Sequence, residues 1–325
     1  MTNPLTVRPR QTPATFLHSD YEPDFDALQA DIAYLGIPYG QAYNYDDIVN
    51  DQTNGPTAMR AASLGVLRGL ERYDFDLGGT LYDGQDIKAV DCGDIRADPT
   101  DRVGHVARSE EAVRRILEAG ALPIILGGDH AIPIPVMRAY GSAGKASKED
   151  PITIIQIDQH IDWRQEVNGV EQGLSSVIRR MSEMDHVGEI FQIGLRASGS
   201  ARPEEVEAAL AYGAHLITAY ELHDEGIDSI LTRIPDGGRY YITIDMDGMD
   251  PSIAPAVNAP APGGVTYMQA RSLIRGLVRK GRVVGMDVVE ITPKHDINKL
   301  TCLTAGRLIA NLVGHAVRAG YFEEA

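Results

Sequence analysis

Seven short apolar runs, separated by segments with helical periodicity, constrain most strongly how this chain can fold. Most runs are apolar at every position, which is typical of strands buried on both faces of a parallel sheet. Parallel neighbours need crossover connections, usually helices, so the pattern predicts an α/β protein with helices on both sides of one sheet. The predicted strands are Ile32–Ile37, Ile87–Val90, Pro123–Leu126, Ile152–Ile157, Ile190–Leu195, Tyr240–Ile244 and Val283–Val289.

Three longer segments have the apolar periodicity of helices. Ser109–Glu118 has acids in its first turn, and Tyr267–Lys280 ends in cations that suit the negative end of a helix dipole. The third predicted helix is Thr301–Arg318. Because no repeat, low-complexity tract or linker divides the chain, we expect a single domain over residues 31–325, preceded by an N-terminal arm over residues 1–30.

The charge balance excludes several classes of partner. Lysine and arginine total 30 against 46 aspartates and glutamates, which gives a net charge of −16 at pH 7. Nucleic acids and anionic membrane surfaces are bound through a surplus of cations, so we expect neither partner. Two cysteines are too few for a disulfide framework, and no apolar run is long enough to span a bilayer or to act as a secretory signal. We therefore expect a cytoplasmic protein.

Polar residues follow the predicted strand Ile152–Ile157 directly. Asp158, His160 and Asp162 alternate along the chain, and side chains of an extended segment return to the same face every second residue. Three acceptors at the carboxyl end of a parallel strand, where such sheets bind ligands, are suited to a metal ion. Taken alone, the segment fits a solvated loop equally well.

A second acidic cluster follows the strand Tyr240–Ile244. Asp245 and Asp247 share a face of the chain, and Asp250 comes soon after them. Mutual repulsion makes such a cluster costly unless a cation compensates it. This favours a metal site over the alternative, a solvated acidic loop.

A histidine follows two glycines and an aspartate after the strand Pro123–Leu126. The glycines permit a tight strand-to-helix turn that would place His130 at the mouth of the sheet. A lone histidine here would more often be structural. Together with the other two segments, however, it completes a set of four carboxylates and two histidines, which predicts a site for two divalent cations.

The ligand types narrow the choice of metal. A carboxylate-rich set with one imidazole per ion and no thiolate suits Mn²⁺ and can accept Ni²⁺, Co²⁺ or Fe²⁺. Two ions about 3.5–4 Å apart can hold a hydroxide as a nucleophile at neutral pH. The predicted reaction class is therefore metal-assisted hydrolysis.

Three ordered motifs resemble the signatures of the ureohydrolases, the family of arginase, agmatinase and guanidinobutyrase, and the likeness is strongest to the agmatinase branch. The motifs are Gly127–His130, Asp158–Asp162, and Thr243–Asp247 continued through Asp250-Pro251 and Pro260–Gly264. Gln159 stands where the family usually has alanine. The likeness covers the chain from about Ile32 to His315.

The resemblance implies a three-layer α/β/α arginase-like fold around a mostly parallel, eight-stranded sheet, and hydrolysis of a guanidino compound to urea and an amine. It also implies two divalent ions per subunit, with Mn²⁺ as the first choice of metal and Ni²⁺ as the second. One ion would take His130, Asp158, Asp162 and Asp245, and the other His160, Asp158, Asp245 and Asp247. The spacing of polar residues after the predicted strands indicates the same six residues.

Two further residues are candidates for substrate contact. Glu290 follows the last predicted strand, where the family places a glutamate that receives the guanidinium of the substrate. A planar cation pairs well with a carboxylate, although an ordinary exposed glutamate is the alternative. Trp163 adjoins Asp162 and could face a guanidinium through cation–π attraction, with packing as the other interpretation.

Two departures from the agmatinase pattern concern the substrate. Agmatinases place a catalytic histidine about ten residues beyond the second signature, where this chain has Gln172, which cannot titrate. The Gly-Thr-Gly-Thr stretch of the third signature is replaced by Ala256–Ala259, a segment bordering the pocket that includes Asn258. We therefore expect a substrate other than arginine or agmatine, with Gln172 as a candidate catalytic residue and Asn258 as a candidate substrate-binding residue.

Two alternatives stay open. The same site could hydrolyse free guanidine, a biguanide or a formimino compound, or the chain could be a metal-binding partner subunit of an active paralogue. The complete ligand set argues against the second alternative, and Gln172 argues for it. The resemblance also implies a homo-oligomer, either a trimer or a hexamer. The alternative is a mixed oligomer that contains a paralogous subunit.

Overall fold

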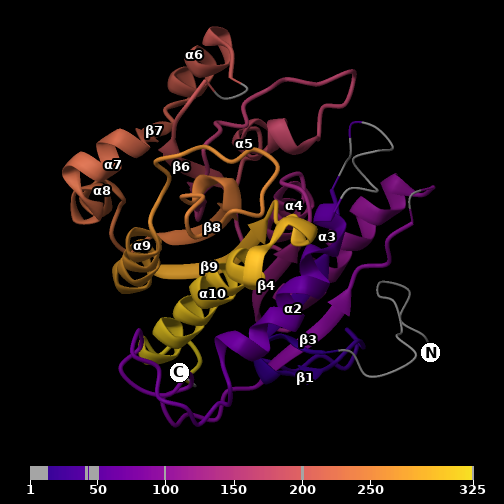
Figure 1. The fold of residues 1–325 in the computed structure, drawn as a ribbon. Coiled ribbons are helices and arrows are strands. Elements are labelled where there is room, and N and C mark those ends of the chain that lie inside the picture. The colour runs from indigo at the N-terminus through magenta and orange to yellow at the C-terminus, as the bar shows by residue number, and fades with distance from the viewer. Residues whose placement is uncertain (1–13, 41–42, 44–50, 99, 199–200, 324–325) are drawn as a thin grey trace.

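One parallel sheet forms the centre of the molecule (Figure 1). The computed structural model describes residues 14–40, 43, 51–98, 100–198 and 201–323. In these ranges the sheet has nine strands in the order β1-β3-β2-β4-β9-β8-β5-β6-β7. They are β1 Asp20–Tyr21, β2 Ile32–Ile37, β3 Ala89–Asp94, β4 Leu122–Gly127, β5 Ile152–Ile157, β6 Val187–Leu195, β7 His215–Thr218, β8 Arg239–Asp245 and β9 Arg282–Val289. All pairings between them are parallel, which confirms the α/β prediction.

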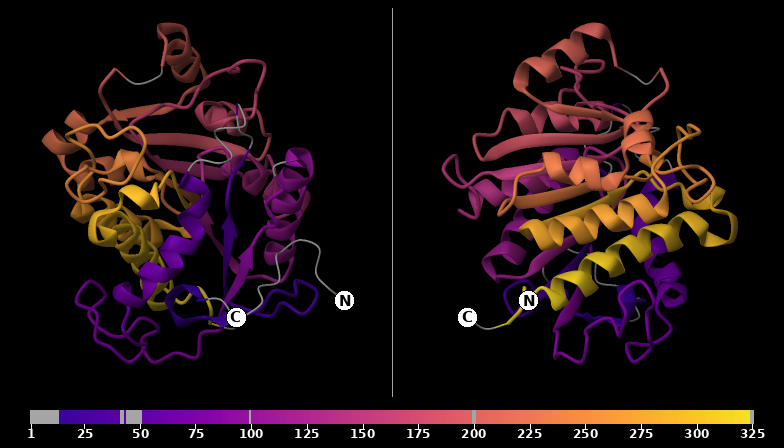
Figure 2. Two further views of the ribbon diagram at one scale, coloured as in Figure 1. Left: turned by 45° about the vertical axis from the view of Figure 1, so that its right-hand side comes forward. Right: turned by 90° about the vertical axis from the view of Figure 1, so that its left-hand side faces the viewer.

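Helices connect the strands and cover both faces of the sheet (Figure 2). They are α2 Gly55–Val66, α3 Arg102–Glu118, α4 Pro133–Ser142, α5 Val177–Ser182, α6 Pro203–Tyr212, α7 Ala219–Glu225, α8 Ile227–Arg233, α9 Tyr267–Lys280 and α10 Leu300–Arg318. The predicted helix at 267–280 is confirmed, with a Thr266–Gln269 capping box at its start. Helix α3 begins before the predicted Ser109, because the Asp101 side chain caps it by accepting from the Gly104 N–H.

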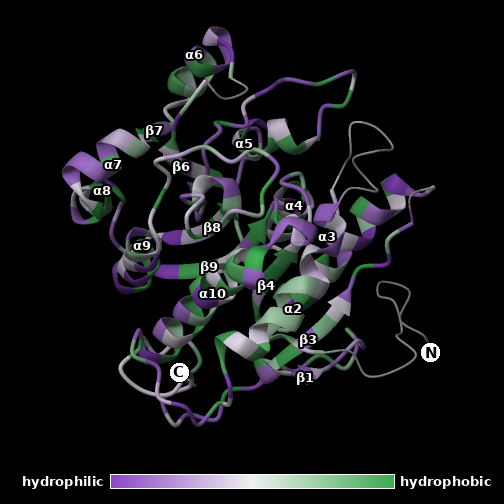
Figure 3. Cartoon of the chain, in the orientation of Figure 1, coloured by the Kyte–Doolittle hydropathy of each residue, from purple (hydrophilic) through white to green (hydrophobic). Residues whose placement is uncertain are grey.

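Two apolar cores lie on opposite faces of the sheet. Neighbouring strand residues point to opposite sides, so Ile124 and Leu126 join the core under α2, α9 and α10, whereas Ile125 joins the core under α3 to α6. The central strands β4 and β9 carry green segments in Figure 3, and helices α7 to α9 carry purple segments. The result is the three-layer arrangement expected for strands that are apolar throughout.

The sheet differs from expectation at its edges. Both strands that the sequence pattern missed are edge strands, and they bring the total to nine where eight were expected. β1 has two residues, and β7 is partly exposed, so neither carries an apolar run. The second predicted strand, 87–90, is found two residues later as β3.

The described part of the predicted arm packs on the body. Phe16 and Leu17 are fully buried in the core beside α2, and the Phe16 N–H donates to Asp91 Oδ2 at 2.9 Å. β1 then pairs with β3. Residues 1–13 lie outside the described part of the chain.

Helix α10 forms the centre of the first core. By length and composition alone the segment Ile297–Arg318 would qualify as a membrane span, but 78% of its apolar window is buried inside the protein. It packs against α2 and α9, as a core helix does.

The topology brings four carboxyl ends together. β4, β9, β8 and β5 are consecutive in the sheet, and the three sequence motifs and Glu290 follow these four strands. Because all four strands run in the same direction, their terminal loops meet at one edge.

Candidate functional site

His130 lies at the centre of a first group of carboxylates. Its Nδ1 atom is 3.1 Å from Asp158 Oδ2, 3.0 Å from Asp162 Oδ2 and 3.3 Å from Asp245 Oδ2. His130 is 1% exposed, and the three carboxylates are buried as well. His130, Asp158 and Asp162 could together hold a metal ion.

His160 lies at the centre of a second group. Its Nδ1 atom is 3.4 Å from Asp158 Oδ1 and 3.3 Å from Asp247 Oδ2. These three residues form another group that could hold a metal ion. Asp158 belongs to both groups and directs one carboxylate oxygen at each histidine. The six residues selected from the sequence are thus brought together, in two adjacent groups that share Asp158.

The backbone after β5 and β8 turns these side chains inward. Asp162 has a φ of +46°, so the segment 158–162 does not stay extended as the sequence pattern assumed. Asp158 Oδ1 accepts a hydrogen bond from the His160 N–H at 2.7 Å, and Asp245 Oδ1 accepts one from the Asp247 N–H at 2.8 Å. These short-range bonds leave the second oxygen of each aspartate directed at His130.

The buried charges of the carboxylate cluster favour the binding of a cation. Burial raises the pKa of Asp162 to about 7, with the Asp158 charge adding to it, and burial followed by Asp247 and Asp158 raises the pKa of Asp245 well above its usual range. Burial lowers the pKa of His130, yet the three carboxylates raise it well above normal in balance. The buried Nδ1 of His130 nevertheless makes no hydrogen bond. A divalent cation among these atoms would relieve both the repulsion and the orphaned nitrogen, so the donor set fits a metal centre.

A hydrogen-bonded chain orients His130 from behind. Its Nε2 lies 3.0 Å from Thr243 Oγ1, and that hydroxyl donates to Asp287 Oδ1 at 2.7 Å. Tyr241 donates its hydroxyl to the other oxygen of Asp287, also at 2.7 Å. Since Thr243 donates to Asp287, it accepts from His130 Nε2–H, which leaves Nδ1 free to bind a metal.

Two amides orient Asp158 in the same manner. Gln156 Nε2 donates to Asp158 Oδ2 at 2.6 Å, and Gln192 Nε2 donates to Gln156 Oε1 at 2.5 Å. Gln192, Gln156, Thr243 and Asp287 are neighbours in register across β6, β5, β8 and β9. A row of buried polar side chains therefore crosses the sheet directly beneath the metal-ligand groups.

Arg196 fixes the loop that follows β8. Its guanidinium is buried and donates to the backbone carbonyls of Asp247 at 2.7 Å and Ala261 at 2.7 Å, with further bonds to Gly248 and Met249. Burial lowers its pKa, although Asp247 and the other aspartates oppose that shift. Arg196 was not predicted from the sequence, because a single arginine after a strand carries no local pattern.

Glu290 lies next to His130 and is buried. Its Oε1 accepts the His130 N–H at 2.8 Å, and Oε2 accepts the side-chain amide of Gln52. Burial raises the pKa of Glu290 to about 8, and its φ of +67° lies in the left-handed region that non-glycine residues rarely adopt. Such strain at a buried carboxylate is typical of a functional site, and each carboxylate oxygen keeps a lone pair for another donor.

Gln172 and Trp163 have their observed contacts outside the two ligand groups. Gln172 is half-buried and lines a cavity of about 420 Å³ with Arg138 and residues of α3. Within the described ranges it makes no hydrogen bond to any of the six candidate ligands. Trp163 is 2% exposed and packs against Tyr212, with ring centroids 5.6 Å apart, which favours its packing interpretation.

Asn258 is exposed on the loop after β8. The side-chain amide of Gln159, buried between two candidate ligands, donates to the Ala259 carbonyl next to it. The glutamine that replaces the usual alanine of the second signature thus ties the loop of Asn258 to the ligand groups.

The comparisons with known proteins agree with this geometry. A sequence model of the arginase family matches residues 30–314. Guanidinobutyrase from Pseudomonas aeruginosa is 28% identical over 91% of this chain and 89% of its own. Mitochondrial agmatinase from Gallus gallus is 29% identical over 87% of this chain and 80% of its own. The solved structure of proclavaminate amidino hydrolase from Streptomyces clavuligerus has a TM-score of 0.81 and 26% identity, covering 95% of this chain and 98% of that one.

The family match spans most of the chain and includes all six candidate ligands and Glu290. The sheet, the two ligand groups at its carboxyl edge and the relatives lead to the same assignment. The chain belongs to the arginase family and is a hydrolase that acts on carbon–nitrogen bonds of guanidino compounds.

Proposed function

We propose that this protein is a binuclear-metal amidinohydrolase that cleaves a small guanidino compound other than arginine or agmatine into urea and an amine. The observation that carries the proposal is the shared carboxylate of Asp158, which directs one oxygen at His130 and the other at His160. Two adjacent cation sites joined by a carboxylate are the arrangement that metal-assisted hydrolysis needs.

The proposed ligands divide between two ions. His130 and Asp162 would hold the first ion, His160 and Asp247 the second, and Asp158 and Asp245 would bridge them. When bound, two such cations lower the pKa of water and polarise the substrate. Mn²⁺ suits the carboxylate-rich set best, and Ni²⁺ is the alternative.

The protein side chains would place the substrate and its protons. We assign Glu290 to the guanidinium, since it is buried beside His130 and can accept further N–H donors. Gln159 would hold the loop of Asn258 at the pocket rim. The leaving amine takes no proton from Gln172, because an amide does not titrate, so a less basic leaving group is favoured.

The names of several relatives favour a guanidino acid or a related compound as the substrate. Guanidinobutyrase and guanidinopropionase of Pseudomonas aeruginosa are 28% and 30% identical to this chain. Proclavaminate amidinohydrolase of Streptomyces clavuligerus is 28% identical over 94% of the chain. A guanidine, a biguanide or a formimino compound remains the alternative substrate class because of Gln172.

A substrate screen tests the proposal. The purified protein, loaded with Mn²⁺ and separately with Ni²⁺, is incubated with guanidino acids, arginine, agmatine, guanidine and biguanide, and released urea is measured. We expect urea from at least one compound other than arginine and agmatine. A protein that binds two ions per chain but releases no urea, and no amine or ammonia, from any compound would contradict catalysis. That result would favour a metal-binding partner subunit.

The remaining proposals are a catalytic domain over residues 31–325 behind an arm over residues 1–30, a homo-oligomer that is a trimer or hexamer, and a cytoplasmic location. The oligomer rests on the resemblance, whereas the domain bounds and the location rest on sequence patterns and composition. Sedimentation velocity on the metal-loaded protein measures the assembly. Co-expression with a paralogous subunit would then distinguish a mixed oligomer.

A further inference from the structure

A second cavity, unrelated to the metal-ligand groups, is lined by arginines from two helices. It has a volume of about 460 Å³ and lies between α9, α10 and the loop at residues 75–78. Arg271, Arg275 and Arg279 of α9 contribute to its lining, together with His315 and Arg318 of α10. The three α9 arginines are four residues apart, which places them on one face of the helix. Four arginines therefore line one cavity in a protein whose net charge is −16.

The helix dipole does not account for this arrangement. Cations are favourable in the last turn of a helix, which explains Arg279 and Arg318. Arg271 lies in the second turn of α9, however, and Arg275 lies in its middle. Like charges four residues apart on a helix repel each other, so this stripe costs stability unless anions compensate it.

The protein supplies partners for two of the four arginines. Arg318 pairs with Asp83 at 3.1 Å and donates to the backbone carbonyls of Thr80, Leu81 and Gly314. Arg271 donates to the Asp76 carbonyl and lies 3.7 Å from Asp76 Oδ1. Arg275 and Arg279 make no hydrogen bond or ion pair in the part of the chain that the structure describes. Two cationic side chains at the cavity thus have no protein partner there.

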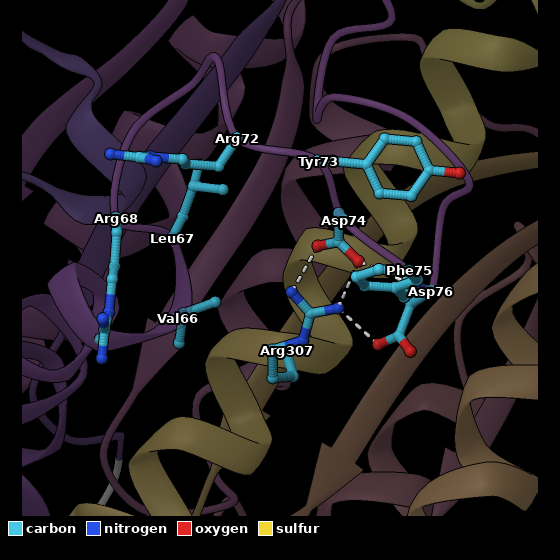
Figure 4. A pocket seen from close by; sticks show the side chains of 10 residues that line it. Val66, Leu67, Arg68, Arg72, Tyr73, Asp74, Phe75, Asp76 and Arg307 are labelled. Atoms are coloured by element: carbon cyan, nitrogen blue, oxygen red, sulfur yellow. Dashed lines mark hydrogen bonds and ion pairs between the residues drawn. The ribbon is translucent and has the colours of Figure 1, made fainter.

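The second carboxylate oxygen of Asp76 is already paired with another arginine, Arg307. Figure 4 shows the Arg307 guanidinium between Asp74 and Asp76, with a bond of 2.8 Å to Asp74 Oδ1 and another contact to Asp76 Oδ2. The hydroxyl of Tyr267 also donates to Asp76. The carboxylate nearest to the α9 arginines is therefore shared with Arg307, and the cavity retains an excess of positive charge.

His315 lies in the same excess of positive charge. Its Nε2 atom is buried and has no hydrogen-bond partner within the described ranges. Burial is the largest cause that lowers the pKa of His315 to about 4, and the charges of Arg271, Arg275, Arg318 and Arg279 contribute to the same shift. A neutral imidazole can still donate one N–H to an anion in the cavity.

We propose that this cavity binds a small multivalent oxyanion of the phosphate class, either inorganic phosphate or the phosphate group of an organic monoester. The planar guanidinium donates two parallel N–H groups, which match the oxygens of a phosphate. The volume is within the range of small-ligand pockets. The cavity extends along α9 and the C-terminal end of α10, and its lining includes neither a candidate metal ligand nor Glu290. The anion site is therefore separate from the catalytic edge.

Thermal unfolding of the metal-loaded protein tests this proposal. The melting temperature is measured against phosphate concentration, with chloride holding the ionic strength constant, and a second series uses AMP. We expect a saturable rise in melting temperature with phosphate, because a ligand that binds only the folded state stabilises it. A tighter response to AMP would identify the organic monoester as the preferred source. A wild-type protein that shows no rise with either anion would overturn the proposal.

Variants locate the site. Arg275→Gln combined with Arg279→Gln should need at least tenfold more phosphate for the same rise. Lys280→Gln is the matched control, since it removes one charge from the same helix at a side chain paired with Asp236. Arg279→Gln alone changes an exposed residue and keeps the test available if the double variant fails to fold.

Two outcomes separate this role from others. In phosphate-free buffer the double variant should melt no lower than the wild type, because removing the charges relieves repulsion; a lower melting temperature would show that the arginines support the fold. An unchanged phosphate response would place the anion elsewhere. A change in sedimentation coefficient, without a change in phosphate response, would show that a second copy of the chain covers the arginines, and the proposal would be wrong.

Discussion

The Nε2 atom of His130 lies 3.0 Å from Thr243 Oγ1, and the hydroxyl of Thr243 donates onward to Asp287. All three residues are buried. Burial raises the pKa of Asp287 to about 6, so the carboxylate is ionised at neutral pH and holds the chain of donors in one direction. This relationship fixes which nitrogen of His130 faces the carboxylate group, and it leads to the first prediction.

Thr243→Val should weaken metal binding without preventing folding. The valine keeps the volume of threonine but leaves the His130 Nε2–H and the Oδ1 atom of Asp287 without a partner, while Tyr241 still donates to Oδ2. We expect metal affinity to fall roughly 10–100-fold, as for other partners of metal ligands. A metal titration with activity as the readout measures the shift, and Thr243→Ser serves as the control that keeps the hydroxyl. Equal affinities in the valine variant and the wild type would contradict the positioning role.

Glu290→Gln should reduce turnover and leave the metal content near normal. Glutamine retains an oxygen that can accept the His130 N–H, but it loses the charge that would hold a guanidinium. We expect a loss of about 10²-fold or more in kcat/KM, the scale of a misplaced substrate. Metal analysis accompanies the kinetics. A variant that loses its metals instead would show that Glu290 supports the metal-ligand groups and does not bind the substrate.

Gln172→His should raise activity on alkylguanidines such as agmatine. The unmodified protein is expected to hydrolyse agmatine weakly, and its pH–rate profile should lack a limb from this side chain because an amide does not titrate. A histidine there could protonate a basic leaving amine. Rates of urea release by the two proteins decide the matter. Brisk agmatine hydrolysis by the wild type, or no gain in the variant, would show that the proton reaches the amine by another route.

The Arg307 cluster should make stability depend on acid pH. Burial raises the pKa of Asp76, but hydrogen bonds from Tyr267, Arg307 and Asn311 outweigh that effect and lower it to about 2. Because the folded-state pKa is depressed, the contribution of Asp76 is fully present above the unfolded value of about 3.9 and is lost as pH falls toward 2. The melting temperatures of wild type and Asp76→Asn should therefore converge over this interval.

Asp228→Asn is a control for the general effect of removing an acid, because Asp228 lies in the first turn of α8 and, within the described residues, makes no hydrogen bond or ion pair with Arg307. The difference in melting temperature between Asp228→Asn and the wild type should not show the same convergence over this pH interval. A gap between wild type and Asp76→Asn that stays constant from neutral pH to pH 2 would contradict the assignment.

Sequence patterns predicted the interior of the fold better than its margins. Strands such as β5 and β9 are buried on both faces, and continuous apolar runs reveal them directly. β7 was missed because His215–Thr218 is partly exposed at the edge. Helix α4 begins at Pro133, a few residues after the glycine turn that predicted a strand-to-helix connection.

The candidate ligands could be found because each follows a buried strand within a few residues. The groups behind them could not, because Arg196 binds carbonyls of a loop fifty residues away, a relationship that only the folded chain creates. The sequence does contain one signal for the groups behind the ligands. Gln156, Thr243 and Asp287 each interrupt an otherwise apolar strand, and a buried polar residue needs a partner in the neighbouring strand.

The shared carboxylate of Asp158 is tested most directly by metal content and urea release measured on the same samples. The wild type should bind two divalent ions per chain, release urea from a guanidino compound, and lose both turnover and thermal stability on chelation, since the empty cluster repels itself. The Asp158→Ala variant should be inactive and should bind fewer than two ions per chain. The His130→Ala variant should bind one of the two ions more weakly and the other normally. An Asp158→Ala variant that keeps two ions and full turnover would contradict the binuclear account.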